Sequence, residues 1–307
     1  MKEIESIFSD LDTKNHTELD SYFTPHLSPI DALRVILYKF SLFIHYYKER
    51  ILDHGEAEDL HQFRVNIRKS RAFLKEFKFL LPDEAYTYFN DRLSFFASQT
   101  NHKRDLDVIK ERLKEVDTDH DVIQEDIAVQ RQNETQKIEE MLKSKMFNDF
   151  FQTYQNTLKN QTLLTSDNTD GTIENTARKV IRHLHLDIIK KIEALEKDFS
   201  DKKLHKIRIS FKKLRYLLEE FPHIFGEEKI EKMIEKGKKL QTLLGDFNDT
   251  VNQNKLLHNY FKSHKKSISH SKGLERRLLK KTSKSQKELL KKTRKKLHKF
   301  KKKTLEI

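Results

Sequence analysis

Hydrophobic residues recur at three- and four-residue spacing along most of the chain, a pattern that predicts helices rather than strands. Ser28 and Pro29 mark the expected start of the first long helix, because Ser caps helix N-termini and Pro fits the first turn. His54 and Gly55 mark its end. We expect further helices over about 56–81, 83–116, 174–199, 202–225 and 227–262, one or two over 121–163, and a weaker helical stripe in the tail.

An internal duplication follows from a second pattern in the same helices. Residues 60–82 align with residues 204–226 without a gap, at an offset of 144. The two segments, LHQFRVNIRKSRAFLKEFKFLLP and LHKIRISFKKLRYLLEEFPHIFG, are identical at 8 of 23 positions. Between the copies, the turn-forming run TSDNTDGT predicts a linker, and Gly226 is expected to cap the second copy's helix. The predicted organisation is an N-terminal extension (1–27), a first half (28–164), a linker (165–172), a second half (173–262) and a Lys-rich tail (263–307).

Composition supports a helical fold without a membrane span. The 307 residues include only 6 Gly and 4 Pro, too few for the turns of a many-stranded protein. There is no Cys, which excludes disulfides and thiolate chemistry, and no apolar run reaches the length that a bilayer requires. We therefore expect an all-α protein of two antiparallel helical bundles, related by a pseudo-two-fold axis around a basic channel. We expect it to be cytoplasmic and not membrane-bound.

The net charge of +13 is concentrated in the tail. Residues 262–307 contain 19 Lys and Arg against 3 Asp and Glu, a net charge of +16, which leaves −3 for residues 1–261. Overall basicity therefore says little about a specific site in the body of the protein.

A basic stripe runs along the helix expected over 56–81. At 100° per residue its five members share an arc of about 80°, beside a separate apolar stripe. They are His61, Arg64, Arg68, Arg71 and Lys75. The arc contains no acid, whereas a solvated helix face usually mixes acids with bases at i,i+4. The second copy repeats the stripe with His205, Arg208, Lys212 and Arg215, but has Glu219 in place of Lys75.

Two interpretations of these stripes are open. A solvated charged face is the common fate of Lys and Arg runs, and His at a helix junction is often structural. The duplication favours a site instead, and the planar fork of Arg matches phosphate oxygens. A phosphate polymer with no bases needs only spaced cations and hydrogen-bond donors.

The pattern LHxxRVxIRKxRxxLxxF, its echo LHxIRIxFKKLRYLLEEF and the run LQTLLGDFNDT (240–250) resemble the CHAD family, the conserved-histidine α-helical domains. The resemblance covers about residues 28–262 and implies binding of inorganic polyphosphate in a basic cavity between the halves. It implies polyphosphate granules and polyphosphate-metabolising enzymes as further partners. The residues implicated by position are the two stripes together with Arg34, Arg178 and Arg182. Asp105 and Asp249 are expected to orient the Arg side chains from behind.

Two other functions compete with this one. The Lys-rich tail is suited to nonspecific nucleic-acid binding, although a docked helix with its lysines outward explains the tail equally well. His102, Asp105 and Asp107 suggest a phosphohydrolase metal site, but no glycine-rich phosphate loop accompanies them. We expect a binding protein with no catalytic residue, metal or cofactor.

Overall fold

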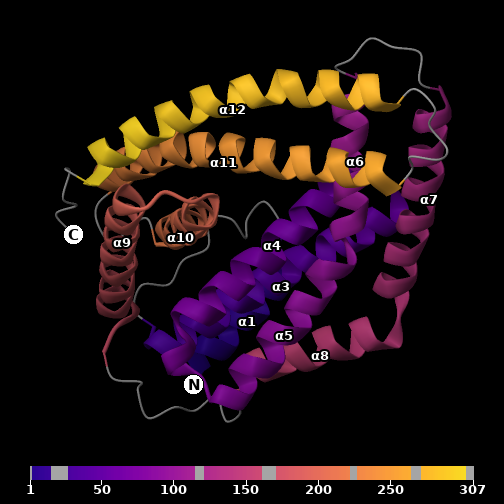
Figure 1. Cartoon of the computed structure of the whole chain (residues 1–307). Coiled ribbons are helices and arrows are strands. Elements are labelled where there is room, and N and C mark those ends of the chain that lie inside the picture. The colour runs from indigo at the N-terminus through magenta and orange to yellow at the C-terminus, as the bar shows by residue number, and fades with distance from the viewer. Residues whose placement is uncertain are drawn as a thin grey trace. The chain divides into compact units, whose positions relative to one another are not determined.

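The computed structural model describes residues 2–14, 27–114, 121–160, 171–221, 227–263 and 271–301. These residues are helical (Figure 1), with no strand in any of the described ranges, which confirms the predicted all-α fold class. The helices are α1 (Lys2–Thr13), α3 (Pro29–Asp53), α4 (Ala57–Glu76), η1 (Lys78–Leu80, a 3-10 turn), α5 (Asp83–Gln99), α6 (Asn101–Lys114), α7 (Asp121–Lys143), α8 (Lys145–Lys159), α9 (Ile173–Lys197), α10 (Asp201–Glu220), α11 (Glu227–Ser263) and α12 (Ser271–Lys301). The expected cap at Gly226 and most of the expected linker lie outside these ranges.

The chain folds into two compact units. Unit 1 comprises residues 1–100, 135–183 and 216–226, and unit 2 comprises residues 101–134, 184–215 and 227–307. The predicted boundaries at 164 and 173, the two-fold axis and the channel stay predictions.

Local sequence signals set the ends of the first helices. The Ser28 hydroxyl accepts a hydrogen bond from the Asp31 backbone N–H at 3.2 Å and so caps α3, as expected. At the other end His54 is the C-cap, and Gly55 follows with φ +64°, a left-handed conformation that costs glycine little. Ser144 separates α7 from α8 by accepting from the Phe147 N–H.

Two expected helices differ from the structure. The helix expected over 83–116 is broken at Thr100, whose buried hydroxyl donates to the Ala97 carbonyl at 2.8 Å. A Thr hydroxyl can compete in this way for a helix carbonyl, and α6 begins anew at Asn101. The helix expected over 56–81 ends earlier, at Glu76, and continues as the 3-10 turn η1 before Pro82.

Unit 1 is built around α3, which packs along α4 and against α1 and α8, while α5 packs on α4 (Figure 1). Aromatic rings fill its centre: Phe96, Phe147 and Tyr154 are fully or almost fully buried. The Phe96 and Phe147 rings meet edge to face with centroids 4.9 Å apart, an arrangement that the ring quadrupoles favour. The high Phe content of the sequence is therefore used as core.

Unit 2 has its own apolar core and includes the basic tail. Residues of α6, α7 and α11 form a buried cluster: Ile109, Leu113, Ile123, Ile127, Leu257, Tyr260 and Phe261. The tail is the long helix α12, which lies along α11 (Figure 1). On α12, Thr293 and Leu297 are buried, whereas Lys291, Lys295 and Lys299 are exposed. In this part of α12, the buried residues therefore face the protein and these lysines face solvent.

Candidate functional site

The first basic stripe lies on α4 in unit 1. Its apolar neighbours Leu60, Phe63 and Ile67 are buried, as the helical period predicts, and they hold α4 against the core. His61 and Lys75 are exposed. The three arginines between them are half-buried, so that their guanidinium groups lie at the boundary of protein and solvent.

Neighbouring helices hold two of these arginines in place. Arg64 donates through Nη1 to the Ala97 carbonyl at 3.0 Å and to the Thr100 hydroxyl, both at the C-terminal end of α5. Arg71 donates through Nε to the Asn90 side-chain oxygen at 3.2 Å, and burial lowers the pKa of Arg71. These contacts fix the direction of both guanidinium groups, each of which carries a positive charge.

Two further cations of this stripe are available to a ligand. Within the described ranges, Arg68 and Lys75 make no hydrogen bond or ion pair. A ligand that bound here would not first have to break a protein contact of either side chain. The face of α4 therefore combines oriented and available cations.

The second stripe lies on α10 in unit 2, where α11 supplies the partners. His205 Nδ1 lies 2.6 Å from the Asn248 side-chain oxygen, and Arg208 Nη2 lies 3.3 Å from Asp249 Oδ1. The Arg208 side chain is 15% exposed and that of Asp249 is 57% exposed. Because ion pairs that reach solvent contribute little, a phosphate could compete with Asp249 for Arg208.

Asp249 also acts on a neighbouring carboxyl. Asp246 precedes it by three residues on α11, and burial first, then the charge of Asp249, raises the pKa of Asp246. On the stripe itself Lys212 and Arg215 are half-buried. Asp249 thus lies beside the second stripe, whereas the expected role of the half-buried Asp105 on α6 stays a prediction.

The three arginines predicted on the preceding helices differ in exposure: two lie at the surface of α9 and one is buried on α3. Arg178 pairs with Glu174 at 2.8 Å on the surface of α9, and Arg182 is exposed one turn further on. Arg34 is 1% exposed. Its Nε and Nη2 donate to the Leu158 and Lys159 carbonyls at 2.7 and 2.6 Å.

The surroundings of Arg34 explain what it does. Leu158 and Lys159 end α8, and the last carbonyls of a helix have no partner within it. Arg34 caps them, while its Nη1 pairs with Asp31 at 2.7 Å. All three guanidinium nitrogens of this buried side chain donate to protein acceptors, so Arg34 serves as a cap of α8.

Sequence reasoning missed a buried charge cluster in unit 1. Lys39 on α3 pairs with Glu220 at the end of α10, and both are buried, with 3% and 8% exposure. Lys69 on α4 lies 3.7 Å from the same carboxylate. The sequence held one signal of this cluster. Lys39 lies three residues after Ile36 and four before Phe43, so it falls in the apolar stripe of α3, where a Lys side chain is buried.

In the ranges that the structure describes, His, Asp and Glu side chains form no group of three suited to a metal ion. Across these same helices, none is both long and apolar enough to cross a bilayer.

Comparison with known proteins places the fold. The chain is similar to the crystal structure of the CHAD domain from the plant Ricinus communis, with a TM-score of 0.77, 22% identity and coverage of 90% of this chain and 93% of that one. It is also similar to PptA from Streptomyces chartreusis, with a TM-score of 0.65, 13% identity and coverage of 91% and 100%. A search of curated proteins gave no match. The sequence profile of the CHAD domain matches residues 43–258, most of the chain, and the protein therefore belongs to the CHAD domain family.

Proposed function

We propose that this protein binds inorganic polyphosphate, or a similar phosphate polymer, without catalysing its turnover. The observation that carries the proposal is that Arg64 and Arg208 are both held in place by a neighbouring helix. These residues occupy equivalent positions of the duplication, and each is held at the solvent boundary by contacts from a neighbouring helix. Preorganised arginines lose less freedom when they bind phosphate oxygens.

The spacing of the cations suits a repeating anion. His61, Arg64, Arg68 and Arg71 are three or four residues apart, which places successive side chains about 4.5–6 Å apart along the axis of α4. A flexible chain with a charge on every unit can meet each cation in turn. Its binding should weaken steeply with salt, as counterion release does for other polyanions.

A charge-matched pair of variants tests the proposal. One variant removes four cations from the stripes and the other removes four from the exposed face of α12. The first changes Arg64, Arg68, Arg208 and Arg215 to Gln, and the second changes Lys291, Lys292, Lys295 and Lys296 to Gln. Polyphosphate affinity is then measured by titration at near-physiological salt, after circular dichroism and thermal melts have shown that both variants are folded.

We expect the stripe variant to lose at least about a hundredfold in affinity, because each charge-assisted hydrogen bond contributes roughly 1.5–3 kcal/mol. The α12 variant should lose less than about fivefold. Equal losses in the two folded variants would show that only net charge matters, and would refute a site on the stripes.

A second function has one observation in its favour. Lys291, Lys292, Lys295 and Lys296 on α12 are exposed, whereas Thr293 and Leu297 of the same helix are buried, an arrangement suited to a nonspecific nucleic-acid surface. Competition between polyphosphate and nucleic acid of matched charge separates the two functions. If nucleic acid binds equally well and only the α12 variant loses it, the tail is the binding surface.

Catalysis and location are tested separately. Phosphate release from polyphosphate with Mg²⁺ or Mn²⁺, above a control without protein, would contradict the non-catalytic part of the proposal. The proposal also carries an expected cytoplasmic location, on polyphosphate granules or with polyphosphate-metabolising enzymes. Imaging a tagged protein beside stained granules tests that expectation.

A further inference from the structure

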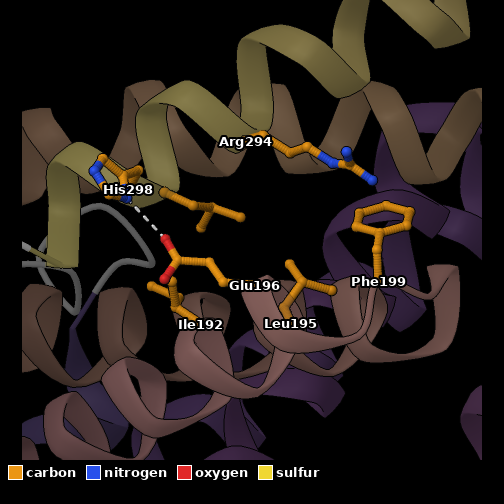
Figure 2. A pocket seen from close by; sticks show the side chains of 7 residues that line it. Ile192, Leu195, Glu196, Phe199, Arg294 and His298 are labelled. Atoms are coloured by element: carbon orange, nitrogen blue, oxygen red, sulfur yellow. Dashed lines mark hydrogen bonds and ion pairs between the residues drawn. The ribbon is translucent and has the colours of Figure 1, made fainter.

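A pocket of about 290 Å³ lies between α9 and α12, within unit 2 and apart from the residues proposed above (Figure 2). Ile192 and Leu195 line it from α9, and Leu297 lines it from α12. All three are almost fully buried, and their side chains make this part of the pocket wall apolar. Ligand pockets usually span about 300–1,000 Å³, and this one has room for a single ring with a substituent.

One end of the pocket holds a positioned arginine. The Arg294 guanidinium lies over the Phe199 ring, 4.1 Å from its centroid (Figure 2). Arg294 forms no hydrogen bond or ion pair within the ranges that the structure describes. Stacking on the ring holds the planar group while its N–H donors stay available, an arrangement suited to an anion.

The other end holds a carboxylate that is already neutralised. Glu196 contacts His298 Nδ1 at 2.9 Å (dashed in Figure 2) and Lys301 Nζ at 2.5 Å. The hydrogen bond from Lys301, then that from His298, lowers the pKa of Glu196. Both carboxylate oxygens are engaged, so a cationic ligand would find no available counterion here.

We propose that this pocket binds a small organic anion: an apolar ring or branched chain against Ile192, Leu195 and Leu297, with one carboxylate or phosphate group on Arg294. The apolar lining disfavours a bare phosphate or polyphosphate, which has no apolar part to bury. The open Arg294 donors disfavour a neutral ligand, which would leave them without an acceptor.

Four probes separate the parts of this proposal: phenyl phosphate, phenylacetate, benzyl alcohol and inorganic phosphate. The first two carry both ring and charge, and the last two carry one each. Binding is measured by ligand-observed NMR and calorimetry on the full chain. Arg294→Gln removes the anion contact, and Lys295→Gln is its control, since the neighbouring lysine is exposed on the same helix and carries the same charge.

We expect at least one of the two aryl anions to bind, and which of them binds identifies the preferred head group. Arg294→Gln should weaken that binding by about tenfold or more, the effect of losing one charge-assisted hydrogen bond. Lys295→Gln should change it by less than twofold. Leu195→Phe, which fills the pocket from the α9 side, should weaken the aryl anion without affecting polyphosphate binding.

Three results would overturn the proposal. One is the absence of millimolar binding by either aryl anion. Another is equal binding of inorganic phosphate and phenyl phosphate, which would indicate a general basic surface. The third is an equal loss in Arg294→Gln and Lys295→Gln while both variants melt like the wild type.

Discussion

Replacing Arg34 by Met separates a structural arginine from a phosphate-binding one. Position in the family pattern implicates Arg34 in phosphate binding, whereas its guanidinium is buried against the end of α8. Met has a similar length and leaves little empty space. The substitution therefore removes the charge and the donors while keeping most of the packing.

The expected cost follows from the contacts that are lost. Two carbonyls at the end of α8 lose their donor, and the Asp31 carboxylate, with 17% exposure, loses its counterion. Breaking a buried pair by removing one partner costs about 3–5 kcal/mol. Asp31 still accepts from the Ser28 hydroxyl at 2.8 Å, so we expect the lower part of that range, about 3 kcal/mol.

The duplication supplies a matched control, Arg178→Met. Arg178 is the equivalent residue at the offset of 144, but its side chain is 42% exposed and pairs with Glu174 within one helix. Such a pair contributes about 0.3–0.5 kcal/mol. Urea unfolding at pH 7 should therefore show a large decrease in the free energy of unfolding for Arg34→Met alone. Its melting temperature should fall by about 6 °C or more, at roughly 2–4 °C per kcal/mol.

Polyphosphate titration of the folded variants completes the test. At a temperature where Arg34→Met is native, its affinity should stay within about twofold of the wild type. A tenfold loss of affinity with unchanged stability would refute the structural interpretation and return Arg34 to the binding site. A stability change equal to that of Arg178→Met would show that the α8 cap contributes little.

Two further predictions concern buried charge and pH. Glu220→Gln leaves Lys39 buried without its counterion, and urea unfolding should show a loss of about 3 kcal/mol, against less than about 0.5 kcal/mol for the exposed control Glu140→Gln. If the two variants unfold alike, the buried pair is not a stabilising element. Burial lowers the pKa of His185, so the folded protein holds the neutral ring while the unfolded chain takes up a proton below about pH 6.5. The corresponding stability is present above pH 6.5 and is lost as pH falls below it. Thermal melts from pH 7.5 to 5.5 should show a weaker pH dependence in His185→Leu than in the wild type, while the exposed control His183→Leu keeps it.

Much of the helical fold could be predicted because its signals are local. Ser28 and Gly55 act through their own backbone and the next turn, and the sequence carries both directly. The break at Thr100 was missed because a single Thr within a helical pattern is ambiguous. Its effect depends on burial and on Arg64 arriving from α4, which is a tertiary contact.

The sequence predicted which helix face carries the cations of the candidate site, but not the groups that those cations contact. The helical period places the cations of α4 beside a buried apolar stripe, and the structure has that arrangement. The period cannot reveal that Ala97 and Thr100 receive Arg64, or that Asn248 receives His205. Lys39 was overlooked for the same reason, since its counterion lies 181 residues away.

The duplication shows why equivalent positions need not have equivalent roles. Residues related by a constant offset occupy the same position around their helices, so their side chains start from equivalent helix faces. The offset does not preserve what lies opposite that face: Arg34 and Arg178 each pair with an acid of their own helix, but Arg34 is buried and also donates to the last carbonyls of α8. In the described ranges Arg68 and Lys75 on α4 make no hydrogen bond or ion pair, whereas on α10 Arg208 pairs with Asp249, and Glu219 stands where α4 has Lys75. Since a nearby carboxylate weakens the attraction of a cation for an anion, the stripe on α4 should contribute more to polymer binding than the stripe on α10.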